Sequence, residues 1–205
     1  MNPASDAGGG ATGARPAGDG ADPRPAVFID RDGTLNVHRG YVRRPEELEV
    51  FPFAGAALRR LADAGWVTVL VTNQAILGRG ECTWQTMDAI HRKLAVALAR
   101  DGARLDAIRI CPHATRGGSG RPRIATCDCR KPLPGLILAA ARELRLDLAR
   151  SWTVGDSTSD IAAGRSAGTQ TILVETGQAG ADRLCDVAPD RVARDFAAAV
   201  DIILG

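Results

Sequence analysis

The chain has 205 residues, of which 45% are hydrophobic and 24% are charged, and its formal net charge is +2. A charge this small does not indicate a nucleic-acid partner or an anionic membrane surface, and no apolar stretch is long enough to cross a bilayer. We therefore expect a soluble globular protein with a sizeable core and neither nucleic acid nor membrane as a partner.

The first 25 residues differ in composition from the rest of the chain. They are rich in Gly, Ala, Pro and Asp and contain no apolar run. We interpret residues 1–25 as a disordered tail, because they have little to bury, and not as a signal peptide or an anchor. Residues 26–205 then form a single domain. The five cysteines are odd in number and follow no secretory signal, which favours free thiols and a cytoplasmic location.

Strands and helices alternate along this domain. Apolar runs predict strands at residues 27–29, 67–71, 107–110, 152–154 and 171–174. Helical spacing predicts helices at residues 54–64, from the N-cap Thr83 to about Asp101, and at 135–145, 160–167 and 196–204. A loop with Gly78 and Gly80 is expected after the second strand. The alternation predicts an α/β fold with a doubly wound parallel sheet and right-handed crossovers.

Polar residues follow three of the predicted strands. Asp30 and Asp32 come after the first strand, Thr72 after the second and Asp156 after the fourth. In a doubly wound sheet the carboxyl ends of the strands share one edge, where ligands bind. We therefore expect these residues to converge there, together with Lys131 from the long loop at residues 111–134.

The segment from Asp30 to Thr34 reads D-R-D-G-T and carries two carboxylates directly after a buried strand. Gly33 allows the backbone to turn sharply, and Thr34 supplies a hydroxyl. Paired carboxylates in this place can hold a divalent cation while one of them attacks and the other moves a proton. The alternative is two acids that flank an ordinary turn.

Four possible metal ligands lie in the long loop. Cys111 and His113 are followed by Cys127 and Cys129, and three thiolates with one imidazole are typical of a closed tetrahedral zinc site. Such a site would staple a loop that has little apolar content of its own. The alternative is a set of unligated thiols with a surface histidine. Cys82 and Cys185 have no comparable partners, and we interpret them as free cysteines.

Four short motifs together resemble the haloacid-dehalogenase-like (HAD) phosphatases. Asp30–Thr34 is similar to their motif I, Thr72 to motif II, Lys131 to motif III, and the G-D-x-x-x-D run at Gly155–Asp160 to motif IV. The motifs occur in the order of that family and span nearly everything after residue 26. The resemblance implies a phosphoric monoester hydrolase that uses Mg²⁺ and an aspartyl-phosphate intermediate.

The resemblance also implies a role for each matched residue. Asp30 would be the nucleophile, and Asp32 the general acid and base. The Mg²⁺ ligands would be the carboxylates of Asp30 and Asp156 and the backbone carbonyl of Asp32. Thr72 and Lys131 would hold the transferring phosphoryl oxygens. Asp160 would orient the metal site from a helix N-terminus, or serve there only as a favourable charge.

Within the HAD phosphatases, the zinc loop followed by C-R-K-P at Cys129–Pro132 resembles the D-glycero-D-manno-heptose-1,7-bisphosphate 7-phosphatases. The histidinol-phosphate phosphatases are the nearest relatives of that group and share the zinc loop. The resemblance implies removal of the C7 phosphate of the heptose bisphosphate, in nucleotide-heptose biosynthesis. Two positions depart from the group, since Ala75 follows T-N-Q and Ser157 follows the motif IV aspartate. The sequence therefore does not specify which sugar phosphate is the substrate.

The inserts after motif I and before motif III are too short for a large cap domain. Residues 37–50 would be a small flap and the zinc loop a second wall, in a protein that we expect to be a monomer. The candidate substrate-binding residues are Asn73, Arg130, Arg39 and His38. His38, Arg39, Arg116 and Arg130 could recognise a second anionic group of the substrate. The alternatives are a histidinol-phosphate phosphatase and, in another class, a non-catalytic zinc-binding scaffold.

Overall fold

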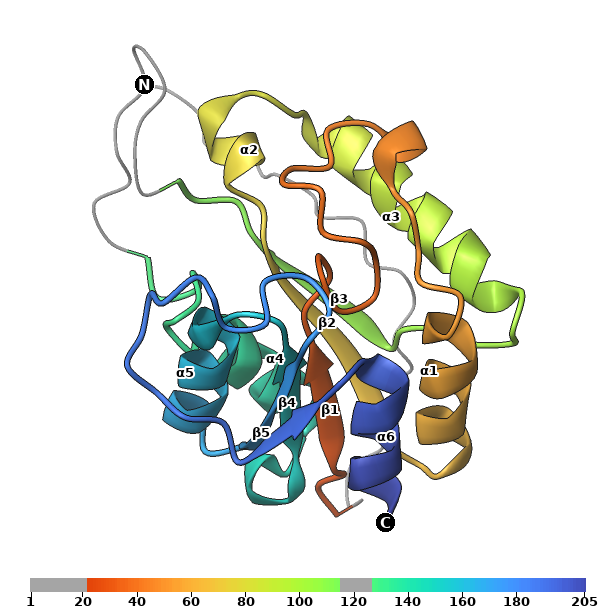
Figure 1. Cartoon of the computed structure of the whole chain (residues 1–205), viewed down its shortest axis with the longest axis vertical. Coiled ribbons are helices and arrows are strands. Elements are labelled where there is room, and N and C mark those ends of the chain that lie inside the picture. The colour runs from red at the N-terminus through yellow and green to blue at the C-terminus, as the bar shows by residue number, and fades with distance from the viewer. Residues whose placement is uncertain (1–21, 115–126) are drawn as a thin grey trace, which may run out of the picture.

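The computed structural model describes residues 22–114 and 127–205, which form a six-stranded sheet with helices on both faces (Figure 1). The sheet is parallel throughout, and its strand order is β3-β2-β1-β4-β5-β6. The strands are β1 (Ala26–Ile29), β2 (Val67–Asn73), β3 (Ala107–Cys111), β4 (Trp152–Gly155), β5 (Gln170–Val174) and β6 (Arg191–Ala193). The predicted doubly wound α/β fold is confirmed. Arg116 and most of the predicted tail lie outside the described residues.

The first strand is buried on both faces of the sheet. Val27 and Ile29 pack into the core beneath α1 (Ala54–Asp63), α3 (Trp84–Ala99) and α6 (Phe196–Leu204). Ala26 and Phe28 pack on the other face, beneath α4 (Gly135–Leu144) and α5 (Thr158–Ala167). Figure 1 shows these two groups of helices on opposite sides of the sheet. A parallel strand that is covered on both sides needs an apolar residue at every position, which explains the unbroken run before Asp30.

Several elements differ from the sequence-based expectation. The loop predicted around Gly78 and Gly80 contains a short helix, α2 (Ala75–Arg79), and Gly80 ends it with a left-handed φ of 72°. β6 was not expected, because it is short and two of its three residues are exposed. Two 3₁₀ turns, η1 (Pro45–Glu47) and η2 (Leu148–Arg150), are also present. Thr83 caps α3 as predicted, by accepting a hydrogen bond from the Thr86 backbone N–H, but the helix ends at Ala99.

The strand register places the ends of three strands side by side. Ile29 at the end of β1 pairs with Leu70 of β2 on one side and with Val154 of β4 on the other. Asp30, Thr72 and Asp156 therefore emerge at the same edge of the sheet. In the described part of the chain, the connection from β1 to α1 contains only the turn η1, and no cap domain covers this edge. None of the described helices is long and apolar enough to cross a membrane.

Candidate active site and metal sites

A cleft of about 1140 Å³ opens at the carboxyl edge of the sheet. Motif residues from three strand ends and from the loop before α4 line it, namely Asp30, Asp32, Thr72, Lys131 and Asp156. Its walls are formed by the flap at residues 37–50, by the described ends of the loop at residues 111–134 and by the loop after β5. These segments contribute among others Tyr41, His113, Arg130 and Gln178. The predicted convergence of the motif residues is therefore confirmed as a spatial arrangement.

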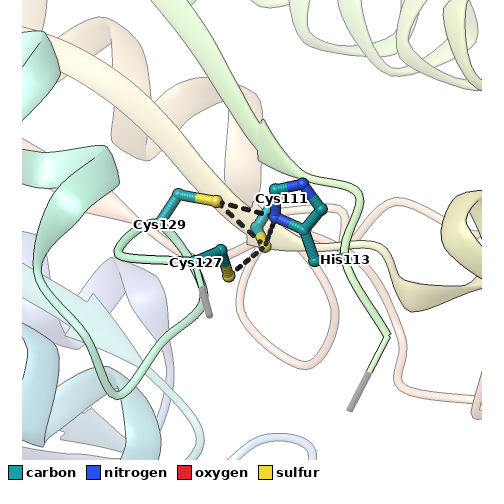
Figure 2. Close-up of side chains that lie close together, drawn as sticks. All are labelled: Cys111, His113, Cys127 and Cys129. Carbon is teal, nitrogen blue, oxygen red and sulfur yellow. Dashed lines mark hydrogen bonds between the residues drawn. The ribbon is translucent and has the colours of Figure 1, made fainter. Parts of the chain in front are cut away.

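Three thiols and one imidazole lie close together at one side of this cleft (Figure 2). The Sγ atom of Cys111 lies 3.3 Å from that of Cys129, 4.0 Å from that of Cys127 and 3.7 Å from Nδ1 of His113. Nδ1 of His113 lies 3.2 Å from Sγ of Cys129. A tetrahedron with metal–sulfur bonds of about 2.3 Å has edges of about 3.8 Å, so these separations fit one four-coordinate ion.

The electrostatics of the thiol cluster are consistent with a bound cation. Burial and the neighbouring thiols raise the pKa of Cys129 far above its usual range, and burial also raises that of Cys111. Thiolates packed this closely repel one another, and a bound divalent cation removes that repulsion. The donor set of three sulfurs and one nitrogen suits zinc.

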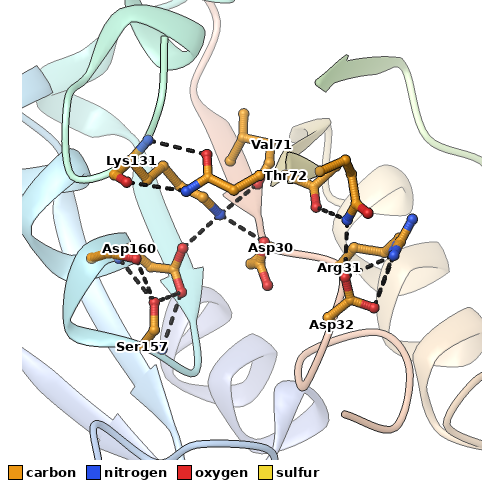
Figure 3. Close-up of polar contacts among 11 residues, drawn as sticks. Asp30, Arg31, Asp32, Val71, Thr72, Lys131, Ser157 and Asp160 are labelled. Atoms are coloured by element: carbon orange, nitrogen blue, oxygen red, sulfur yellow. Dashed lines mark hydrogen bonds and ion pairs between the residues drawn. The ribbon is translucent and has the colours of Figure 1, made fainter. Parts of the chain in front are cut away.

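The cleft floor is organised around the buried Lys131 (Figure 3). Its Nζ lies 2.6 Å from Oδ1 of Asp30 and 2.6 Å from Oδ1 of Asp160, and donates to the carbonyl oxygen of Val71 at 2.7 Å. Burial alone would lower the pKa of Lys131, but the charges of Asp160 and Asp30 outweigh it and raise the pKa. Lys131 is therefore a fixed positive charge beside the Asp30 carboxylate.

A second group of carboxylates lies at the same place. Ligand oxygens of Asp30, Asp156 and Asp160 lie within 4.8 Å of one another, and all three residues are buried. Burial raises the pKa of Asp156 to about 8, and repulsion from Asp30 and Asp160 adds to this rise. Burial also raises the pKa of Asp30 to about 7, against the opposing effect of Lys131. Three carboxylates beside one ammonium group leave excess negative charge, which fits an oxygen-bound divalent cation.

Asp156 is held between two glycines that have positive φ. A Cβ atom at Gly33 (φ +86°) would lie 2.2 Å from Oδ2 of Asp156, and one at Gly177 (φ +76°) would lie 2.1 Å from it. The backbone N–H of Gln178 donates to the same oxygen at 2.7 Å, and the Thr176 hydroxyl donates to the Gly33 carbonyl at 2.6 Å. Sequence reasoning missed this loop after β5. The pair Thr176-Gly177 indicates a turn, but no sequence pattern predicts that this turn contacts motif I.

Asp32 points away from Lys131 and is surrounded by hydrogen-bond donors. Figure 3 shows Asp32 and Arg31 on one side of Asp30, with Lys131 and Asp160 on the other. Nη2 of Arg31 lies 2.7 Å from Oδ2 and 3.0 Å from Oδ1 of Asp32. Asn36 donates to Oδ1 and Gln74 to Oδ2, each at 3.0 Å. Burial would raise the pKa of Asp32, but Arg31 and these hydrogen bonds outweigh it and lower the pKa.

Two side chains at the end of β2 hold neighbouring motif residues. Nδ2 of Asn73 donates to the Lys131 carbonyl at 3.0 Å, and the Lys131 N–H donates to Oδ1 of Asn73 at 3.1 Å. Asn73 therefore fixes the backbone that carries the lysine. Nε2 of Gln74 donates to the Thr72 hydroxyl at 2.9 Å as well as to Asp32, and so links motifs I and II. Sequence reasoning gave no role to Gln74.

The remaining candidate residues lie in different places. His38 and Arg130 line the cleft, and Nη1 of Arg130 donates to the His113 carbonyl at 3.0 Å. Arg39 is exposed and forms an ion pair with Glu49, and it is not among the described residues that line the cleft. Arg116 lies outside the described residues. Asp160 belongs to the capping box of α5, where its Oδ2 accepts from the Ser157 backbone N–H at 3.1 Å, and the Ser157 hydroxyl donates to the same oxygen at 2.7 Å.

Sequence comparisons give close relatives over nearly all of the chain. A D-glycero-D-manno-heptose-1,7-bisphosphate 7-phosphatase from Thermosynechococcus vestitus is 43% identical over 190 residues, which cover 88% of this chain and 96% of the relative. A D-glycero-beta-D-manno-heptose-1,7-bisphosphate 7-phosphatase from Rhodopseudomonas palustris is 41% identical over 71% of this chain and 80% of the relative. This chain belongs to the heptose-1,7-bisphosphate 7-phosphatase family. The HAD-hydrolase-like family model matches residues 128–199.

Solved structures agree with the family assignment. The D,D-heptose 1,7-bisphosphate phosphatase of B. bronchiseptica, complexed with magnesium and phosphate, has a TM-score of 0.76 and 38% identity, covering 88% of this chain and 98% of that one. The corresponding enzyme of Burkholderia thailandensis has a TM-score of 0.67 and 28% identity, covering 89% of this chain and 99% of that one. The resemblance read from the motifs is confirmed, and the chain is a HAD-type phosphoric monoester hydrolase.

Proposed function

We propose that the protein removes the C7 phosphate of D-glycero-D-manno-heptose 1,7-bisphosphate through an aspartyl-phosphate intermediate. The observation that carries the proposal is the contact of 2.6 Å between Lys131 Nζ and the Asp30 carboxylate. In the same cleft, carboxylate oxygens of Asp30, Asp156 and Asp160 lie within 4.8 Å of one another. This arrangement suits phosphoryl transfer, which depends on in-line placement and on neutralisation of charge. We infer the identity of the sugar substrate from the names of the relatives.

In the first step, an Asp30 carboxylate oxygen attacks phosphorus as the bond from phosphorus to the sugar oxygen breaks. The leaving alkoxide takes a proton from the Asp32 carboxyl group. Lys131 and Thr72 donate hydrogen bonds to the phosphoryl oxygens, where negative charge must be stabilised. Val71 and Asp160 hold two of the three N–H donors of Lys131, and the third, which donates to Asp30, can turn to a phosphoryl oxygen.

In the second step, water attacks the phosphorus of the aspartyl-phosphate and gives its proton to the Asp32 carboxylate. The bond between phosphorus and the Asp30 oxygen breaks, inorganic phosphate leaves, and Asp30 returns to the carboxylate form. Asp32 ends the cycle with the proton that it lost in the first step. Its five side-chain hydrogen bonds from Arg31, Asn36 and Gln74 hold the carboxylate in one place and favour its ionised form, which is the form that takes the proton from water.

The carboxylates of Asp30 and Asp156 and the backbone carbonyl of Asp32 would hold Mg²⁺, with Asp160 beside them. When bound, the cation supplies charge neutralisation between the nucleophile and the phosphate dianion. The buried, mutually repelling carboxylates support this assignment. Cys111, His113, Cys127 and Cys129 would hold a structural zinc, which orders the wall that carries Arg130 and Lys131.

The second phosphate of the substrate would be recognised at the cleft wall. Arg130 is the strongest candidate, because it lines the cleft beside Lys131 and offers planar donors to an anion. His38 and Tyr41 lie across the cleft on the flap and can contact the sugar. Arg39 would need to leave Glu49 to take part. A cytoplasmic location and a monomeric state stay predictions.

A panel of phosphate esters tests the proposal, with released phosphate measured in the presence of Mg²⁺. We expect the highest kcat/KM for the heptose 1,7-bisphosphate, and release of one phosphate per molecule. A preference for histidinol phosphate would contradict the proposed substrate while leaving the reaction in place. No turnover of any ester would favour the non-catalytic scaffold instead.

A further inference from the structure

A buried histidine that takes no part in the proposed chemistry lies behind motif I. His91 belongs to α3, is 7% exposed, and its Nε2 lies 3.3 Å from Nη1 of Arg31. Burial, together with the charge of Arg31, lowers the pKa of His91 to about 4, so the imidazole is neutral at neutral pH. A guanidinium can only donate, and Nε2 must therefore be the unprotonated ring nitrogen that accepts from it.

Arg31 is the largest fully buried side chain of the described residues, with an exposure of 0%. One edge of its guanidinium faces α3, where Nη1 contacts His91 and lies 3.5 Å from Sδ of Met87. The other edge, Nε and Nη2, contacts the Asp32 carboxylate. A buried cation is costly unless its donors are paired, so acceptors on both edges fix the guanidinium in one orientation.

We propose that His91 is a positioning residue for the reaction, which fixes the Asp32 carboxylate by holding Arg31 from behind. The inference rests on the acid–base role proposed above for Asp32. Proton transfer requires the carboxyl oxygen within hydrogen-bond distance of the leaving oxygen, and small misplacements of a catalytic group reduce the rate strongly. Loss of the acceptor at His91 would leave Nη1 with only the weak acceptor Sδ of Met87 in the core and would free the guanidinium to turn away from Asp32.

The geometry also explains why a histidine is present on an otherwise apolar face of α3. The buried neighbours of His91 on this helix are Met87, Ile90 and Leu94. A polar side chain among them is destabilising unless it is paired, and Arg31 supplies the partner. The ring reaches across from α3 to a residue 60 positions earlier in the chain.

Two substitutions separate positioning from packing. His91→Leu fills the space but removes the acceptor, whereas His91→Gln keeps an acceptor oxygen near the position of Nε2. Ile90→Val, on the same helix and at a side chain that offers Arg31 no hydrogen-bond acceptor, is the matched packing control. Each variant is assayed with phenyl phosphate, a poor leaving group, and with 4-nitrophenyl phosphate, a good one, and its thermal unfolding is measured.

The readout is the ratio of kcat/KM for phenyl phosphate to that for 4-nitrophenyl phosphate, since a misplaced acid harms mainly the poor leaving group. For His91→Leu we expect this ratio to fall roughly tenfold, part of the ~10²–10⁴-fold that acid–base catalysis supplies. His91→Gln should recover most of it, and Ile90→Val should leave it at the wild-type value. A fall in the ratio that tracks loss of thermal stability across all three variants would overturn the inference.

Asp32→Asn serves as the benchmark, because it removes the acid directly. If Asp32→Asn lowers the ratio and His91→Leu does not, His91 has only a packing role. If Asp32→Asn lowers both rates equally, Asp32 is not the acid and the inference falls with it. Neither result depends on the sugar, because both esters lack one. If the enzyme does not hydrolyse the heptose bisphosphate, that result contradicts only the proposed substrate and not the role of His91.

Discussion

Asp30 and Lys131 show at the scale of single residues how burial and a neighbouring ammonium group act in opposite directions on one carboxylate. The carboxylate is desolvated, which raises its pKa to about 7, and Lys131 offsets part of that cost. A desolvated carboxylate is a stronger nucleophile than one in water, provided that a cation keeps it ionised. The lysine is shared with Asp160 and so remains in place when Asp30 is altered.

Replacing Asp30, the proposed nucleophile, tests its role. Asp30→Asn keeps the shape and a hydrogen-bond acceptor for Lys131, but it cannot form an acyl-phosphate. We expect kcat to fall below about a hundredth of the wild-type value, a loss of at least ~2.7 kcal/mol in transition-state stabilisation, with folding retained. Steady-state kinetics and circular dichroism measure the two effects. Retention of more than that hundredth would contradict the assignment of Asp30 as nucleophile.

Gly177 offers a second test at this scale, because it sets the place of Asp156. In Gly177→Ala the new Cβ would lie 2.1 Å from Oδ2 of Asp156, so the carboxylate must move. We expect Mg²⁺ affinity, measured by calorimetry, to weaken about 10–100-fold, as for other residues that orient metal ligands.

Gly180→Ala is the matched control for this change. It has a similar positive φ of +75°, but its Cβ would meet the side chains of Leu173 at 3.2 Å and Thr158 at 3.9 Å and no carboxylate. Both variants should lose about 1–2 kcal/mol of stability from the positive φ. Equal Mg²⁺ affinities in the two variants would refute a specific role for Gly177.

At the scale of elements, the two described ends of the loop between β3 and α4 carry the thiol cluster. These two ends approach each other through the four metal-ligand candidates, and Cys111 is the last residue of β3. Arg130 and Lys131 come directly after Cys129, so any cation that holds the thiols also places these two side chains. The same loop is fixed a second time where Asn73 of β2 binds the backbone of Lys131.

Cys127→Ser tests the role of the cluster. We expect the variant to lose about one zinc per chain and to lose activity because Arg130 and Lys131 are misplaced, while the sheet stays folded. Elemental analysis beside kinetics measures both effects. Cys185→Ser, outside the cluster, should change neither. Full activity of a zinc-free Cys127→Ser protein would show that the cluster does not order the active site.

At the scale of the whole molecule, the apolar residues of the core and the charged residues of the cleft lie in different parts of the parallel sheet. The two apolar layers on either side of β1 hold the fold, whereas the charged groups converge at the carboxyl edge of the strands. Buried carboxylates at that edge oppose folding unless a cation pairs with them. Two metals would therefore have different effects on the protein as a whole.

Removal of each metal separates these effects. Omission of Mg²⁺ should abolish activity reversibly, with little change in circular dichroism, because the cation would neutralise charge between the nucleophile and the phosphate and would tie no loop together. Removal of zinc by a thiol-selective chelator should instead lower the melting temperature, and Mg²⁺ alone should not restore activity. A zinc-free protein that is fully active with Mg²⁺ would contradict the structural-zinc assignment.

Much of the fold and of the site could be predicted from local sequence. The apolar run before Asp30, the strand-helix alternation and the spacing of Cys111, His113, Cys127 and Cys129 all depend on neighbours in the chain. Strand ends in a parallel sheet share an edge, so the convergence of motif residues followed from their position after strands. The short helix α2 and strand β6 were missed because their apolar patterns are too short to be recognised as a helix or a strand.

Only the tertiary structure decided which way the side chains point and what holds them. Gly177 lies against Asp156 and Gly33, and His91 lies behind Arg31, although these pairs are far apart in sequence. Arg39 follows His38 directly, yet only His38 lines the cleft, since Arg39 pairs with Glu49. Periodicity specifies which face of an element is buried, whereas the partner of a polar side chain depends on how distant elements pack.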